Sequence, residues 1–170
     1  NSCIKITSPS QNETEFRDFV IIGGETELDQ VWFCLRGPQG DIVTHYADVK
    51  DGKFSVKVFL RFGQGVYTFW AGDNSTHFDG SIRFKIKNLS NADTRYYSPS
   101  VYIDSEDPIV TDIVRTIVQP HMSNMDKLRS IHSWVSNNIT YDYNAFINKD
   151  NTIYKASRTI IKQKGICRDY

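Results

Sequence analysis

The sequence predicts a two-part chain, with an all-β sandwich first and a mainly α-helical part after it. Over residues 1–90, short apolar runs alternate with polar residues and are separated by turns rich in Gly, Pro and Asn. From residue 105 the apolar spacing changes to the period of a helix. Between them, residues 91–104 are polar and contain Pro99, which indicates a linker. We therefore expect a sandwich at 1–90, a linker at 91–104 and a helical part at 105–170.

The length and composition are those of an ordinary globular protein. The chain has 170 residues, of which 39% are hydrophobic and 24% charged, so it can bury a core in one domain or in two. Its formal net charge is zero, which leaves no long-range field to attract nucleic acid or an anionic membrane. The sequence contains no apolar run of the length that spans a membrane.

The clearest strand of the β part follows a hairpin signal at Asp51-Gly52. About seven strands of this kind, separated by turns, are typical of an immunoglobulin-like sandwich. The run from Asp51 to Tyr67 also resembles the immunoglobulin-like modules of bacterial surface proteins. We expect Trp32 and Trp70 to pack in the core of this sandwich, and the alternative is that they are exposed ligand contacts. The apolar face of the strand after the hairpin consists of Val56, Val58, Leu60 and Phe62.

The first two helices of the helical part are predicted from their caps and apolar stripes. The first begins after a Ser105 cap, has Pro108 near its start and stops at Pro120. The second begins at Ser123, which with Asp126 comes close to a capping box. The stripe of the first is Ile109, Val110, Ile113, Val114, Ile117 and Val118, and that of the second is Leu128, Ile131, Val135 and Ile139.

A third helix is predicted from Tyr154 to Lys164, after a polar loop at residues 144–151. Two lysines in its last turn and Gly165 just beyond it are a common way for a helix to end, with the glycine at positive φ. Cys167 then lies just past the helix end. If a new helix begins there, its N-terminal amides and dipole favour the thiolate form, which attacks carbonyl carbons.

The three cysteines, Cys3, Cys34 and Cys167, lack the C-x-x-C spacing of a structural zinc site. Cys3 and Cys34 either form one disulfide or remain reduced and partly buried, and the second is the commoner fate of isolated cysteines. There are no paired histidines at metal spacing and no phosphate-binding loop in the sequence, so we expect neither a metal nor a cofactor.

The segment around Cys167 resembles the nucleophile segment of the transglutaminase-like superfamily, which has a papain-like cysteine fold. Upstream, Ile139-Thr140-Tyr141-Asp142 after a helix resembles the entry to the same core, and the resemblance covers residues 103–170. It implies that Cys167 is the nucleophile. Tyr141 either packs structurally or borders the active-site cleft, and Asp142 either caps a turn or belongs to that cleft. The residues that match the nucleophile pattern in order are Ala156, Lys164, Gly165, Ile166, Cys167, Asp169 and Tyr170.

The resemblance implies acyl transfer through a thioester on a protein glutamine or a peptide amide. In the family, the histidine and aspartate that complete the triad follow the cysteine, whereas all four histidines of this chain precede it. We therefore expect the chain to be inactive as it stands, either as a piece of a larger enzyme truncated just after the nucleophile or as a degenerate relative. His132, beside the stripe of the second helix, is expected to be a structural residue, and the alternative is that it pairs with Cys167. The other histidines are His45, His77 and His121.

The partner implied by this resemblance is a protein or peptide substrate. An incomplete core would leave apolar faces open, which predicts a homodimer or the exchange of a strand or helix. The chain begins at Asn1 rather than Met, which is compatible with a removed signal peptide or lipid anchor. We expect an extracellular or cell-surface location, with any lipid or wall anchor upstream of Asn1. The alternative function is a non-enzymatic surface binding or adhesion module, in which the sandwich binds a protein or glycan.

Overall fold

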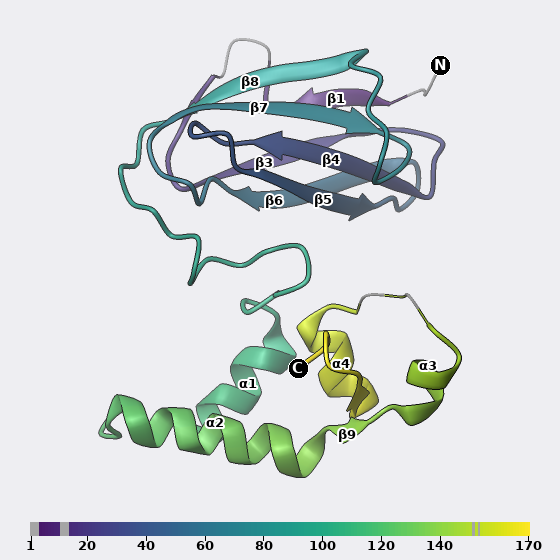
Figure 1. Cartoon of the computed structure of the whole chain (residues 1–170). Coiled ribbons are helices and arrows are strands. Elements are labelled where there is room, and N and C mark those ends of the chain that lie inside the picture. The colour runs from purple at the N-terminus through teal and green to yellow at the C-terminus, as the bar shows by residue number, and fades with distance from the viewer. Residues whose placement is uncertain (1–3, 11–13, 151, 153) are drawn as a thin grey trace. The chain divides into compact units, whose positions relative to one another are not determined.

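The computed structural model describes residues 4–10, 14–150, 152 and 154–170, and divides the chain into two compact units, Asn1–Ser100 and Val101–Tyr170 (Figure 1). The first unit is rich in β-strands and the second contains the helices. This confirms the predicted order of a β-rich part followed by a mainly helical part. Each unit is described by itself below.

The β-rich unit consists of two sheets. One has the order β1-β3-β6 and is antiparallel throughout, and the other has the order β2-β8-β7-β4-β5, with β2 parallel to β8. The first sheet contains β1 (Lys5–Ser8), β3 (Phe19–Glu25) and β6 (Lys53–Phe59). The second contains β2 (Glu15–Phe16), β8 (Ile82–Asn88), β7 (Gly65–Gly72), β4 (Gln30–Arg36) and β5 (Ile42–Asp48).

The core of this unit lies between the sheets and takes every second side chain of each central strand. In β4, Val31, Phe33 and Leu35 are fully buried, while their neighbours on the other face are not. The assignment of Trp32 and Trp70 to the core is therefore wrong, because the alternation places both on the outer face of the five-stranded sheet, where they are half-buried.

The turn between β6 and β7 is anchored by buried polar groups. β6 ends at Phe59, earlier than the predicted apolar alternation, and Leu60 and Phe62 are buried in the turn. The hydroxyl of Tyr67 lies 2.9 Å from the Leu60 carbonyl oxygen and accepts a hydrogen bond from the Phe62 N–H. The Asn88 side-chain amide donates to the same Leu60 carbonyl at 3.0 Å. Burial raises the pKa of Tyr67 to about 12, so its hydroxyl remains a donor.

The helical unit begins with two helices whose caps are formed by their own neighbours. The carboxylate of Asp107, rather than the predicted Ser105, accepts from the Ile109 N–H, because Pro108 occupies the first helical position. Ser123 caps the second helix as predicted, accepting from the Asp126 N–H at 3.2 Å. These helices are α1 (Pro108–Ile117) and α2 (Asn124–Asn138).

The rest of the unit contains two short helices and two short strands. The segment predicted as a loop at 144–151 instead begins with a helix, because the Asp142 carboxylate accepts from the Ala145 N–H and caps it. The elements are β9 (Thr140–Tyr141), α3 (Tyr143–Ile147), α4 (Ala156–Lys162) and β10 (Lys164–Gly165).

Few side chains of the helical unit are buried. α1 contacts both α2 and α4, but the apolar stripes of these helices line an open groove of about 200 Å³ instead of closing on one another. Within the described part of the chain, no helix is long and apolar enough to cross a membrane. Among the described residues of the unit, the buried ones are Ile139, Ser157, Thr159, Gly165 and Ile166.

Candidate functional site

The structure pairs the two sequence segments that carry the resemblance. β9 lies parallel to β10, with Thr140 opposite Lys164 and Tyr141 opposite Gly165. The N–H of Thr140 donates to the Gln163 carbonyl, and the N–H of Asp142 donates to the Gly165 carbonyl, both at 2.9 Å. The segment after α2 therefore fixes the backbone that leads into Cys167.

Position 165 requires a glycine because there is no room for a side chain there, and not because of the backbone conformation. The predicted positive φ falls at Gln163, with φ of 53°, while Gly165 continues as a strand. A Cβ at position 165 would lie 2.9 Å from the Asp169 Cβ and 3.2 Å from the Thr159 Cγ2. Without a side chain at Gly165, Asp169 can fold back against the strand.

Cys167 opens a turn that closes on Asp169. The Asp169 N–H donates to the Ile166 carbonyl at 2.8 Å, and the Asp169 carboxylate accepts from the Ile166 N–H at 2.9 Å. In a capping box, the side chain three positions after the cap residue accepts a hydrogen bond from the backbone N–H of the cap residue. The contact of Asp169 with Ile166 is this half of the motif. Ile166 is buried and Cys167 is exposed, so the turn presents the thiol to solvent from its first position.

The side chains that flank Cys167 hold the turn in place. The Asp169 side chain is only 4% exposed, and its Oδ1 has no hydrogen bond and lies 3.8 Å from the Arg168 Nε. Arg168 donates through Nη2 to the carbonyl oxygens of Asp150 and Thr152. Asp169 therefore supports the backbone of the segment that contains Cys167.

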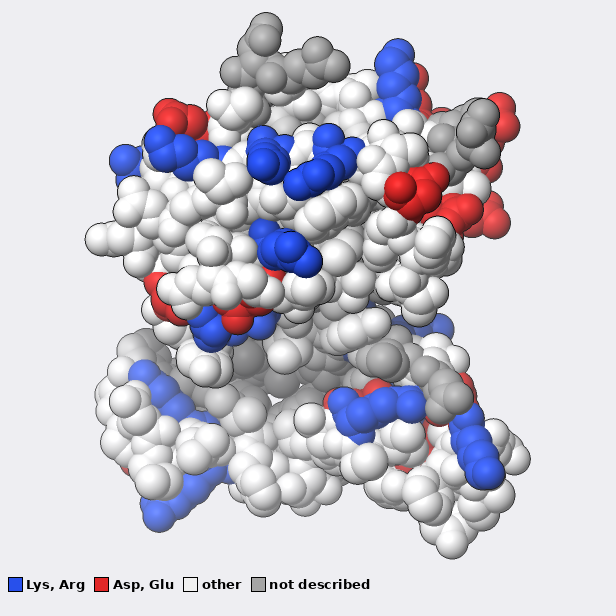
Figure 2. Space-filling view, turned by 45° about the horizontal axis from the view of Figure 1, so that its top comes forward, with Lys and Arg blue, Asp and Glu red and all other residues white. Residues whose placement is uncertain are grey.

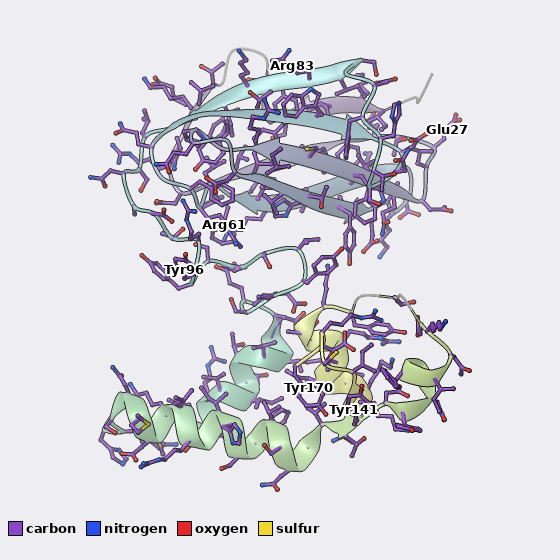
Figure 3. All side chains as sticks on the ribbon, in the orientation of Figure 1. Glu27, Arg61, Arg83, Tyr96, Tyr141 and Tyr170 are labelled. Carbon is purple, nitrogen blue, oxygen red and sulfur yellow. The ribbon has the colours of Figure 1, made fainter. Side chains whose placement is uncertain are left out.

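Tyr141 and Asp142 have structural contacts in the unit. Asp142 caps α3, and the half-exposed Tyr141 ring lies 6.2 Å from the ring of Phe146. The Tyr170 hydroxyl donates to the Ile139 carbonyl at 3.2 Å. Figure 3 shows both tyrosines at the end of the unit where α4 and β9 lie. Asp142 thus acts as a cap, and Tyr141 remains a candidate border of the site.

Among the described residues, no histidine forms a hydrogen bond with Cys167. His132 is exposed on α2, and His45 is buried in β5, where burial and then the charge of Arg61 lower its pKa to about 4. Of the cysteines, Cys34 is a free, half-buried thiol, and Cys3 lies outside the described residues, so the Cys3–Cys34 disulfide stays untested. The described residues contain no cluster of His, Cys, Asp and Glu able to hold a metal ion.

Asp104 is a positioning residue that the sequence reasoning did not find. Its carboxylate accepts from the Ser157 N–H at 3.0 Å and from the Ser157 hydroxyl at 2.5 Å. α4 has no side-chain cap of its own, so Asp104 supplies the cap from 53 residues away. The only local capping signal in this part of the sequence is in the next residues, Ser105-Glu106-Asp107. The cap that forms there belongs to α1.

Residues 110–170 match the family model described as a transglutaminase-like domain. The match contains both paired segments and ends at the turn of Cys167. It supports the general relationship that the two motifs predicted. Because it spans these residues alone, it bears on the helical unit and not on the β-rich one.

Seven chains of solved structures also match. One is the crystal structure of trypsin activated alpha-2-macroglobulin from Escherichia coli, with a TM-score of 0.38 and 10% sequence identity. The alignment covers 50% of this chain and 6% of that chain, and a likeness of this size carries no argument about function. The comparison with curated proteins gives no match.

Proposed function

We propose that the helical unit is the nucleophile-bearing part of a transglutaminase-like core and that Cys167 is its nucleophile. The observation that carries this proposal is the exposed thiol at the first position of a turn fixed on both sides. β9–β10 pairing holds the chain before Cys167, and the Asp169 carboxylate holds the turn after it. The family match over residues 110–170 supports the same assignment.

The reaction proposed is acyl transfer on a protein glutamine or a peptide amide. The Cys167 sulfur attacks the amide carbonyl carbon, the C–N bond breaks, and ammonia or an amine leaves with a proton. An amine or water then attacks the thioester and releases the thiol. Turnover requires a base within hydrogen-bond reach and a group that orients it. We propose that a histidine and an acid from outside the described site complete it, so that these residues alone are inactive in turnover.

We also infer that the β-rich unit is an immunoglobulin-like accessory domain. Its two sheets, β1-β3-β6 and β2-β8-β7-β4-β5, share one core. Tyr67, near the start of β7, bonds through its hydroxyl to backbone a few residues upstream. A tyrosine corner of this kind is a hallmark of immunoglobulin-like sandwiches.

Acylation by p-nitrophenyl acetate tests the nucleophile without requiring the missing base. The folded chain is treated at mildly acidic pH, and the acetylated cysteine is located by peptide mapping. We expect the label on Cys167 and a release of p-nitrophenol that is lost in Cys167→Ser. The matched control is a synthetic peptide of residues 163–170, which has the same local sequence without the fold. Acetylation of the peptide as fast as of the folded chain would overturn the proposal.

A further inference from the structure

The outer face of the five-stranded sheet has aromatic and basic side chains in register. On β7, Trp70 lies opposite Arg83 of β8 on one side and opposite Cys34 of β4 on the other. One step along, Thr68 lies between Lys85 and Arg36. At the other end of the face, the rings of Trp32 and Tyr46 lie 5.2 Å apart. The basic-aromatic face is defined by Trp32, Arg36, Tyr46, Trp70, Arg83 and Lys85.

Trp70 holds two arginines in place. The Arg83 guanidinium lies 5.4 Å from the centroid of the Trp70 ring and the Arg36 guanidinium 5.7 Å from it. The two arginines come from strands on either side of β7. Stacking on one ring restricts both side chains before any partner arrives, so less rotamer entropy is lost when they bind.

The face has an excess of positive charge. Arg36, Arg83 and Lys85 make no ion pair with an acid among the described residues, while the two acids on this face are already engaged. Glu15 pairs with Lys87 at 2.9 Å, and Asp48 accepts from the Gln30 side-chain amide at 2.9 Å. Figure 2 shows Lys and Arg side chains gathered on the β-rich unit with few acids between them. Because the chain as a whole has zero net charge, the excess is local.

Protection of a free sheet edge does not account for this arrangement. β8 pairs with β2 only over Lys87–Asn88, so Arg83 and Lys85 could serve to block the rest of its edge against another strand. Arg36, Trp70 and Trp32, however, belong to β4 and β7, which are interior strands of the sheet. Edge protection gives no reason for half-buried tryptophans and a stacked arginine at those positions.

We propose that the basic-aromatic face binds an acidic polypeptide segment. The planar guanidinium of an arginine can donate two parallel hydrogen bonds to one carboxylate. Arg36 and Arg83 provide two such groups, already held in position. Trp, Tyr and Arg are the residue types that contribute most of the binding energy in protein–protein interfaces, and the Trp32–Tyr46 pair offers the apolar contact beside the charges. This proposal concerns the β-rich unit and does not depend on the role of Cys167.

The experiment measures fluorescence anisotropy of a labelled peptide of alternating Glu and Phe, titrated with the whole chain at low and at physiological ionic strength. The isosteric Gln–Phe peptide is the control for charge. We expect the acidic peptide to bind, to weaken with salt, and to lose about tenfold or more in affinity in Arg36→Ala/Arg83→Ala. The matched control, Lys50→Ala/Lys53→Ala, removes the same charge from elsewhere on the unit and should bind as the unchanged chain does.

Cys34 provides a readout that needs no variant. It lies in the middle of the basic-aromatic face, so bound acidic peptide should slow its alkylation by iodoacetamide and leave that of Cys167 unchanged. Equal binding of the two peptides, unchanged affinity in the arginine variant, or unprotected Cys34 would overturn the proposal. Binding of polygalacturonate but not of the acidic peptide would also overturn it and assign the face to an acidic glycan.

Discussion

His45 makes the stability of the β-rich unit depend on pH. It is 5% exposed in β5, and its Nε2 has no hydrogen-bond partner among the described residues. Burial, with the charge of Arg61 second, lowers its pKa from 6.5 to about 4. Above pH 6.5 it is neutral in both states, and between 6.5 and 4 only the unfolded chain binds the proton. Stability therefore falls as the pH falls through this window, by about 3 kcal/mol in total.

Urea unfolding at pH 7 and pH 4.5 checks this prediction. Trp134→Phe leaves Trp32 and Trp70, so the fluorescence reports the β-rich unit alone. The loss of stability between pH 7 and pH 4.5 should be smaller in His45→Leu than in the unchanged chain, because leucine cannot be protonated. In the control His77→Gln, at an exposed histidine, the loss should equal that of the unchanged chain. Carboxylates titrate in the same window, so the decisive quantity is the difference between the variants. The same loss in His45→Leu as in the unchanged chain would contradict the assignment.

At the scale of elements, Gly165→Ala should disrupt the link between β9 and β10. The added methyl lies within 2.9 Å of the Asp169 Cβ, so Asp169 must move and release the Ile166 N–H. We expect a loss of about 1–3 kcal/mol, as is typical of overpacking. Faster amide hydrogen exchange at Asp142 and Ile166 should accompany it. In the control Gly23→Ala, the nearest atom is at 3.4 Å, and no such change is expected; equal effects at both glycines would contradict the steric argument.

The parts of the fold that the sequence predicts are those set by local patterns. The cap at Ser123 depends on residues within three positions, so the sequence contains the whole signal. Asp104 caps α4 across 53 residues, and no spacing rule reaches that far. The face of Trp32 was misassigned because Val31–Leu35 is an unbroken apolar run, which hides the period of two that the structure shows.

The two units of the whole chain differ in how much they bury, and this predicts different stabilities. The β-rich unit encloses large side chains such as Phe33, Tyr67 and Phe69 completely. In the helical unit, α1 and α2 contain no buried residue. The groove beside them stays open, and its apolar lining includes Val110, Ile113, Ile117, Ile131, Trp134, Val135 and Ile160. Less apolar area removed from water means less stabilisation of the helical unit.

We therefore expect the helical unit to unfold at lower urea than the β-rich unit. Trp32→Phe/Trp70→Phe leaves Trp134, which lines the groove, as the reporter, and Trp134→Phe gives the complementary curve. The sequence predicts homodimerisation through the open apolar faces. Such a dimer would move the Trp134 transition to higher urea as the protein concentration rises, and would leave the transition of the β-rich unit in place. A Trp134 transition that coincides with the β-rich one at every concentration would contradict both expectations, because it would mean that one cooperative core spans the chain.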